Sequence, residues 1–145
     1  MAEYIYIPEQ TVNFGQGVLL NGSFPCNRNS VLHDDGSSLF TLRGPSGFSN
    51  QCAARYQVTF TANIAVPTGG TVGEISTAIA RSGETLGQSL AAITPAAVDQ
   101  FGNVTSTTYV SVPNGCCSQI SVRNTSETGE PILVRNANLV ITRIA

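Results

Sequence analysis

The chain has 145 residues and a mass of 15.2 kDa, which is the usual size of one domain. Hydrophobic residues make up 41% of it and charged residues only 11%, so the chain is too apolar to remain disordered and its surface is mostly uncharged. The seven basic residues are all arginine and the formal net charge is -2, which excludes nucleic-acid binding, because that function needs clustered basic side chains.

The N-terminal segment is a short apolar stretch that ends at Pro8. It has no basic segment before it and is too short for the core of a signal peptide, and no other stretch has the roughly eighteen apolar residues of a membrane helix. We therefore expect synthesis in the cytoplasm and no membrane partner. Residues 1–10 are interpreted as an N-terminal arm or edge strand, and residues 11–145 as a single domain.

Two roles are open for the apolar residues of this segment. As an edge strand, they complete the sheet of their own domain, which is the favoured interpretation. As an arm, they dock on another protein by adding a strand to its sheet. The candidate docking residues are Tyr4, Ile5, Tyr6 and Ile7.

Apolar and polar residues alternate with a period of two along most of the chain, which predicts strands. The clearest segment is Arg55–Val66, and Pro67–Gly70 ends it. A helix over Leu86–Gln100 is disfavoured by Gly87 and Pro95. The predicted strands are Thr11–Phe14, Gly17–Phe24, Ser38–Arg43, Arg55–Val66, Thr71–Arg81, Ser89–Thr94, Val104–Val112, Gln119–Asn124 and Ile132–Ile144. Short strands at this spacing indicate an all-β sandwich or barrel.

The last predicted strand carries apolar residues on both of its faces. We expect one face to fill the sandwich and the other to meet further copies of the chain, because large apolar patches are rarely left exposed. One face holds Leu133, Arg135, Ala137, Leu139, Ile141 and Arg143, and the other holds Val134, Asn136, Asn138, Val140, Thr142 and Ile144.

The residues that bear chemistry do not form a catalytic or metal-binding pattern. His33 is followed by Asp34 and Asp35, but Asp-Gly is typical of a turn and no nucleophile motif is present. Adjacent aspartates point apart and lack the rhythm of a calcium loop. We therefore expect neither an enzyme nor a cofactor.

The four cysteines are Cys26, Cys52, Cys116 and Cys117, and they lack the knuckle spacing of a zinc site. We expect reduced thiols, because the chain is made in a reducing compartment. Pairing of Cys26 with Cys52 in an oxidising medium remains open.

Carbohydrate sites usually stack a sugar on an exposed aromatic ring, and this chain has no tryptophan. The alternation places Tyr56 and Phe60 in the core. The remaining candidates for exposed rings are Tyr4, Tyr6, Phe48 and Phe101. Packing of these rings within the sandwich or between copies is the favoured interpretation.

Three segments resemble the jelly-roll domains of the TNF and C1q type. Residues 55–60, Arg-Tyr-Gln-Val-Thr-Phe, are similar to that family's aromatic strand, and residues 75–83 are similar to the strand and turn that follow it. Residues 138–144 are similar to its final strand, which lies near the threefold axis. The resemblance implies a jelly-roll β-sandwich that forms a homotrimer. The predicted interface residues are Tyr56, Leu139, Ile141 and Arg143. In such a trimer we expect Arg135 or Arg143 to pair with acids of another copy.

A narrower resemblance is to small TNF-like proteins of phages and prophages of gut Firmicutes. It rests on Asn13-Phe14-Gly15 and on the F-T-L-R-G segment, residues 40–44. It implies a protein of the virion surface, either a capsid decoration protein or the knob of a head or tail fibre, with capsid or fibre proteins as partners. A compact decoration protein is favoured because no Gly-X-Y run or heptad precedes the domain. The alternatives are a receptor- or glycan-binding fibre tip and a bacterial surface module for adhesion.

Overall fold

The computed structural model describes residues 2–24, 31–33, 36–45, 52–115 and 117–144. These ranges form strands joined by turns, with one 3-10 helix, η1 (Gly87–Ser89), and no helix in them is long and apolar enough to span a membrane. The strands are β1 (Ala2–Tyr6), β2 (Gln10–Val12), β3 (Asn21–Phe24), β4 (Val31–Leu32), β5 (Phe40–Arg43), β6 (Ala53–Ala65), β7 (Ile75–Arg81), β8 (Glu84–Thr85), β9 (Ala91–Ile93), β10 (Gly102–Pro113), β11 (Cys117–Asn124) and β12 (Ile132–Arg143).

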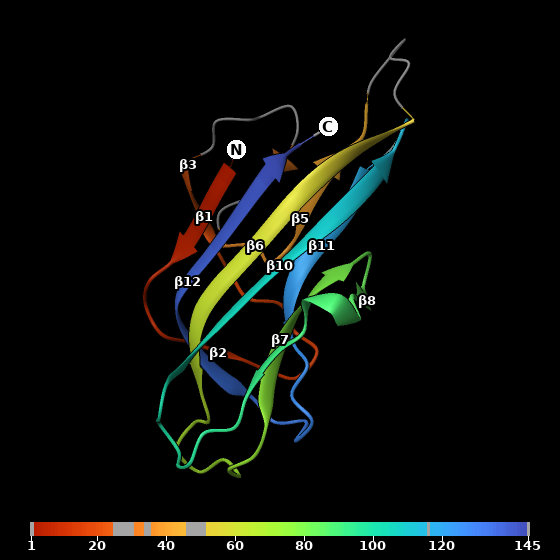
Figure 1. The fold of residues 1–145 in the computed structure, drawn as a ribbon. Helices are drawn as coiled ribbons and strands as arrows, with labels where there is room; N and C mark the ends of the chain where they lie inside the picture. Colours follow the sequence, from red (N-terminus) through yellow and green to blue (C-terminus); the bar gives the residue numbers. More distant parts are fainter. Residues whose placement is uncertain (1, 25–30, 34–35, 46–51, 116, 145) are drawn as a thin grey trace.

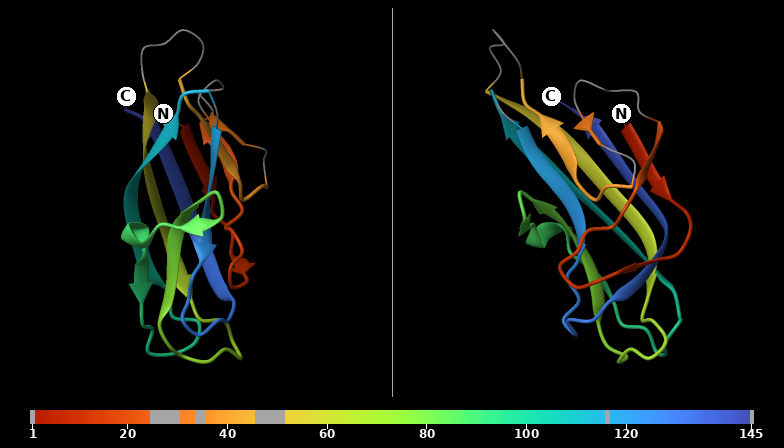
Figure 2. Two further views of the ribbon diagram at one scale, coloured as in Figure 1. Left: turned by 90° about the vertical axis from the view of Figure 1, so that its right-hand side faces the viewer. Right: turned by 180° about the vertical axis from the view of Figure 1, so that it is seen from behind.

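Two antiparallel sheets pack face to face (Figure 2). Sheet A has the strand order β10-β6-β12-β1-β3, and β2 also pairs with β12. Sheet B has the order β4-β5-β11-β7-β8, and β9 also pairs with β7. Both chain termini lie at one end of the sandwich (Figure 1). The opposite end, made by the loops 66–74, 94–101 and 125–131, is called the distal end below.

The core lies between the sheets, and β6 shows how the sequence creates it. Every second side chain of β6 points inward and is at most 1% exposed, while the residues between them are more exposed. Full burial of each large apolar side chain contributes about 1.5–3 kcal/mol. This confirms the strand predicted at Arg55–Val66. The inward residues are Ala54, Tyr56, Val58, Phe60, Ala62 and Ile64.

The segment with the competing helical pattern is mostly not helical. Only η1 forms, and its buried Ser89 ties it to β7: the backbone N–H of Ile79 donates to Ser89 Oγ at 2.8 Å. Ser89 Oγ in turn donates to the Leu86 carbonyl at 2.7 Å. The chain then forms β9, which lies within the strand predicted at Ser89–Thr94.

Strand β1 belongs to sheet A of its own domain, as the favoured interpretation of residues 1–10 requires, but it lies inside the sheet and not at its edge. It pairs with β12 on one side, from Ala2 opposite Ile141 to Tyr6 opposite Ala137, and with β3 on the other. The paired part of β1 therefore has no free edge for the sheet of another protein, and β3 takes the place at the edge.

A β-bulge in β12 corrects the predicted faces of the last strand. The register with β6 shifts between Arg135 and Asn138, and Asn136 has a left-handed backbone with φ of 53°. The extra residue reverses the alternation on its N-terminal side. Ile132 and Val134 are consequently buried, whereas Arg135 is exposed.

Candidate self-association surface

The outward face of sheet A carries few charges along its two central strands. On β6 the outward residues from Gln57 to Asn63 are half-buried glutamine, threonine and asparagine. On β12 the outward residues after the bulge are also half-buried and uncharged. Depletion of charge is typical of the centre of protein interfaces. The β12 residues are Asn138, Val140 and Thr142.

The polar side chains on this face bond to one another across neighbouring strands. Thr59 and Thr107 hydroxyls lie 3.1 Å apart, and Asn138 Nδ2 donates to Glu3 Oε2 at 3.3 Å. Such cross-strand pairs stabilise a sheet and reduce the cost of removing its polar groups from water. The face is therefore polar, but part of the hydrogen-bonding capacity of its side chains is already used within the chain.

Three asparagines form a chain of hydrogen bonds near the distal part of this face. Asn103 Nδ2 on β10 donates to Asn63 Oδ1 on β6 at 3.3 Å. Asn63 Nδ2 donates in turn to Asn136 Oδ1 on β12 at 3.2 Å. The bulge makes the second bond possible, because it brings Asn136 next to Asn63 while its backbone N–H donates to the Ile7 carbonyl at 3.1 Å.

Arg135 precedes Asn136 in the bulge and reaches across β6. Its Cζ lies 3.8 Å from the centroid of the Phe101 ring, which stands just before β10. A guanidinium over an aromatic ring gains about 0.5–1 kcal/mol at an exposed site. No hydrogen bond or ion pair joins Arg135 to any other described side chain, so its N–H donors remain available at a fixed position.

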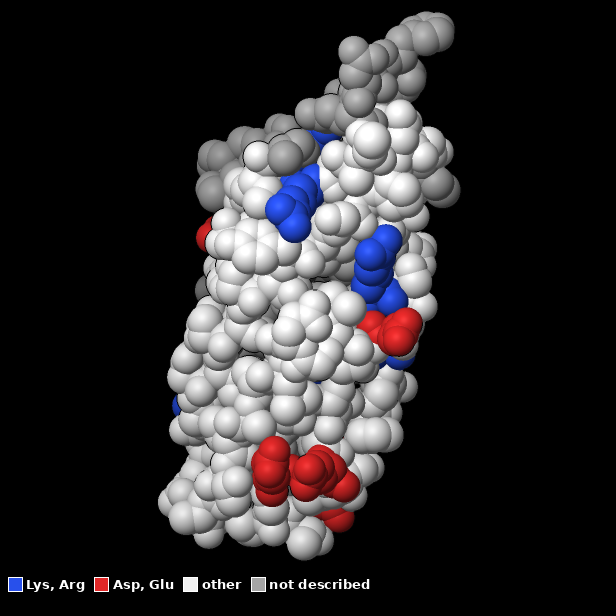
Figure 3. All heavy atoms as spheres, turned by 45° about the vertical axis from the view of Figure 1, so that its right-hand side comes forward, with Lys and Arg blue, Asp and Glu red and all other residues white. Residues whose placement is uncertain are grey.

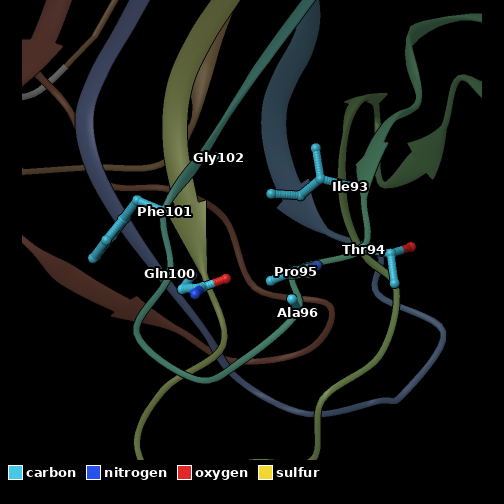
Figure 4. Close-up of a pocket in the computed structure, with 7 residues that line it drawn as sticks. All are labelled: Ile93, Thr94, Pro95, Ala96, Gln100, Phe101 and Gly102. Carbon is cyan, nitrogen blue, oxygen red and sulfur yellow. The ribbon is translucent and has the colours of Figure 1, made fainter.

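A shallow groove of about 270 Å³ lies beside this pair (Figure 4). The side chain of Ile93 packs against the backbone of Gly102 on one side of this groove. A Cβ at position 102 would lie only 2.6 Å from Ile93 Cδ1, so the contact requires glycine. Figure 4 shows Phe101 pointing away from Ile93 and Pro95. The lining residues are Ile93, Thr94, Pro95, Ala96, Gln100, Phe101 and Gly102.

The residues predicted for the trimer interface divide between core and surface. Tyr56 and Leu139 are 0% exposed and Ile141 is 1% exposed within a single copy. Their side chains have no surface left for a second copy, so the prediction is corrected for these three. Arg143 is exposed, but its register opposite Tyr56 places it on the inward side of the sheet, at the end near the termini.

The predicted docking residues are also divided. Tyr4 is 4% exposed, whereas Ile7 is 61% exposed. Ile5, Tyr6 and Ile7 border a groove of about 330 Å³ with Pro8, Asn21 and Gly22. Ile7, just beyond β1, is therefore the most exposed of the four, while Ile5 and Tyr6 are half-buried.

His33 belongs to an aromatic cluster that joins the two sheets. Its ring stacks on Phe40 with centroids 4.1 Å apart, and Tyr4 meets both rings edge-on at 4.7 Å. His33 Nε2 lies 2.9 Å from the Ser37 carbonyl oxygen and donates to it. This environment is that of a packed side chain. Asp34 and Asp35, predicted as a turn, lie outside the described residues.

Burial raises the pKa of the Tyr4 hydroxyl above its ordinary value of 10.0. The cause is desolvation, which disfavours the charged phenolate. At 4% exposure Tyr4 belongs to the core and leaves no ring face open to a sugar.

Of the other candidate rings, Phe101 is partly packed, as the favoured interpretation expects. Phe101 is half-buried with one face covered by Arg135, and Phe48 lies outside the described residues. Among the side chains whose burial is described, the most exposed aromatic ones are Phe14 at 55% and Tyr109 at 56%. Alternation within Val104–Val112 could have identified Tyr109, because its neighbour Val110 faces the core.

Cys52 and Cys117 carry exposed free thiols, whereas Cys26 and Cys116 lie outside the described residues. Within the described ranges, no three His, Cys, Asp or Glu side chains gather as a metal site would require.

The fold is similar to solved structures over the whole chain at low sequence identity. The globular domain of zebrafish complement 1qA protein has a TM-score of 0.67 and 10% identity, covering 99% of this chain and 96% of that chain. Eiger TNF from S. frugiperda has a TM-score of 0.69 and 13% identity, with coverages of 100% and 92%. Murine APRIL has a TM-score of 0.57 and 7% identity, with coverages of 95% and 97%.

A scan against protein families finds no match, and a search of curated proteins finds none either. The structural similarity shows that the chain has the TNF/C1q-like jelly-roll fold. It confirms the predicted fold class. The number of copies that assemble stays a prediction.

Proposed function

We propose that this chain is a non-enzymatic structural protein that assembles as a homotrimer through the outward face of sheet A and decorates the surface of a phage particle. The observation that carries self-association is the low charge and internal hydrogen bonding of that face along β6 and β12. A small net charge of -2 does not oppose the approach of further copies.

The virion setting is supported by the sequence resemblance to phage TNF-like proteins, through residues 13–15 and 40–44. The second of these segments contains β5 and begins with the buried Phe40. Decoration also suits a compact domain, because both termini lie at one end and leave the distal end free (Figure 2).

Self-association is tested by the solution mass of the purified chain, measured by light scattering at low concentration under reducing conditions. We expect about three times the chain mass of 15.2 kDa. Val140 lies at the centre of the face, opposite Thr59 on β6 and Glu3 on β1. Val140→Arg is expected to give a folded monomer, because a charge in an interface centre is costly to desolvate.

Val72→Arg is the matched control, because Val72 lies 44% exposed in the loop between β6 and β7. We expect this variant to keep the wild-type mass. A monomeric wild-type chain would contradict the trimer.

Attachment is tested by co-sedimentation with capsid shells from the phage genome that encodes the chain. The proposal predicts that the wild type sediments with the shells. A chain that stays in the supernatant, with its trimer intact, would contradict the decoration role and leave self-association standing.

A further inference from the structure

We propose that Asn114 is a site of spontaneous deamidation, at which the folded chain converts an asparagine into aspartate or isoaspartate as the protein ages. The reaction is independent of the proposed trimer and of its setting. It needs an asparagine followed by a residue whose backbone nitrogen is unhindered, and glycine is the least hindered because it has no Cβ. The sequence contains two such pairs, Asn21-Gly22 and Asn114-Gly115.

The reaction at Asn114 uses the backbone of the next residue as the nucleophile. Hydroxide removes the proton from the Gly115 nitrogen, and this nitrogen attacks Cγ of the Asn114 side chain. The new bond from nitrogen to Cγ forms, the bond from Cγ to Nδ2 breaks, and Nδ2 leaves as ammonia with a proton taken from water, which returns the hydroxide. Water then opens the succinimide ring at either carbonyl. In sum, one amide and one water become one carboxylate and one ammonium ion.

The turn that holds Asn114 leaves the nitrogen of Gly115 open to this step. The two residues connect β10 in sheet A with β11 in sheet B, and both are exposed. The Gly115 N–H donates to the Pro45 carbonyl at 3.5 Å, which is long for a hydrogen bond. A Cβ built on Gly115 would have no described atom within 4 Å. Closing the ring requires rotation of the peptide between the two residues, and the described strand pairing does not extend to that peptide.

The other pair has the same two residue types but lies in a paired strand. Asn21 and Gly22 belong to β3 and stand opposite Ile5 and Tyr4 of β1. Rotation of their peptide requires β3 to separate from β1, whose Tyr4 is packed in the core at 4% exposure. Opening a paired strand costs more free energy than opening an exposed turn. The fold therefore selects Asn114 over Asn21.

The charges around the turn also favour the reaction. Arg55 stands opposite Ser111 near the end of β10. Arg43 stands opposite Cys117 at the start of β11. A cation in the neighbourhood favours the deprotonated form of the attacking nitrogen. Acidic side chains gather near the distal end in the view of Figure 3, whereas β10 ends at the end that holds the termini. Each conversion therefore adds one negative charge to the formal net charge of -2, away from those acids.

The test follows deamidation of the whole folded chain in mildly alkaline buffer by peptide mass spectrometry. Cleavage after arginine places Asn21 in residues 1–28 and Asn114 in residues 82–123, and fragmentation assigns the converted position. We expect Asn114 to convert at least about tenfold faster than Asn21, which corresponds to a difference of about 1.4 kcal/mol in opening free energy. In guanidinium chloride we expect similar rates at both sites, because the fold no longer distinguishes them.

Two variants serve as matched controls. Asn114→Gln is expected to stop conversion at position 114, because the longer side chain would have to close a larger ring. Asn21→Gln is expected to leave the rate at Asn114 unchanged. In the folded wild type, an Asn21 that converts as fast as Asn114, or an Asn114 that stays intact while the unfolded chain converts, would overturn the proposal.

Discussion

Tyr4 shows how a residue from the very start of the chain becomes part of the core. It meets the stacked rings of His33 and Phe40 edge-on and is 4% exposed, so its side chain is shielded from water. Edge-on aromatic pairs of this kind contribute about 0.5–1.5 kcal/mol beyond their buried area. A position that looked available for docking in the sequence is therefore used for stability.

The raised pKa of Tyr4 predicts a loss of stability at high pH. Above pH 10, the unfolded state loses the phenol proton first, so the folded state holds more protons and the free energy of unfolding falls as pH rises toward the folded pKa. Tyr4→Phe is expected to reduce this fall. Urea unfolding at pH 8 and pH 11 measures it, with Tyr109→Phe at an exposed site as control. Equal falls in wild type and Tyr4→Phe would contradict the prediction.

At the scale of elements, the bulge in β12 sets which residues face outward. It turns Ile132 and Val134 into the core and presents Arg135 and Asn136 beside Asn63. Asparagine suits this position, because its short polar side chain tolerates a left-handed backbone. The asparagine chain and the Arg135–Phe101 pair both depend on this one extra residue.

Two substitutions separate the backbone role of Asn136 from its hydrogen bond. Both Asn136→Gly and Asn136→Ala remove the bond from Asn63. We expect Asn136→Ala to lower the free energy of unfolding by about 1–2 kcal/mol more than Asn136→Gly, because alanine is strained at φ of 53°. Urea denaturation at one protein concentration measures the difference. Equal stabilities would show that the bulge relaxes.

Strand β1 gives a second prediction at this scale. Deletion of residues 1–9 is expected to abolish cooperative unfolding, because it removes backbone partners from both β12 and β3. Circular dichroism during heating follows this transition. Ile7→Ser is the control, since Ile7 is 61% exposed, and we expect a change within about 0.5 kcal/mol. A deletion variant with the wild-type melting temperature would show that β1 is dispensable.

For the whole molecule, the sequence predicted the sandwich well because period-two alternation reports burial directly. The strands β6, β10 and β12 were placed within about two residues of their observed ends. The short segments were less predictable: Gly17–Phe24 contains only β3 as a strand, because Val18 and Leu20 are buried through isolated bonds to Val122 and Ser37.

The surface was less predictable than the fold, because it depends on partners far apart in the sequence. Tyr56, Leu139 and Ile141 lie on β6 and β12, the strands that form the candidate surface, yet alternation turns them inward. The Arg135–Phe101 contact crosses a strand, and no local pattern reports it. The bulge in β12 could not be predicted either. Asn136 is the residue that marks it, and the sequence does not distinguish Asn136 from the other asparagines.

The pairing of β1 with β12 also has a kinetic consequence. Ala2 lies opposite Ile141, so β1 can pair with β3 early but with β12 only after residues 132–143 have left the ribosome. Chains dominated by such distant pairings close their loops slowly, and they fold on the scale of milliseconds to seconds. Until then β6 and β10 form an incomplete sheet with an open edge. The growing chain is therefore prone to aggregation until β12 covers that edge.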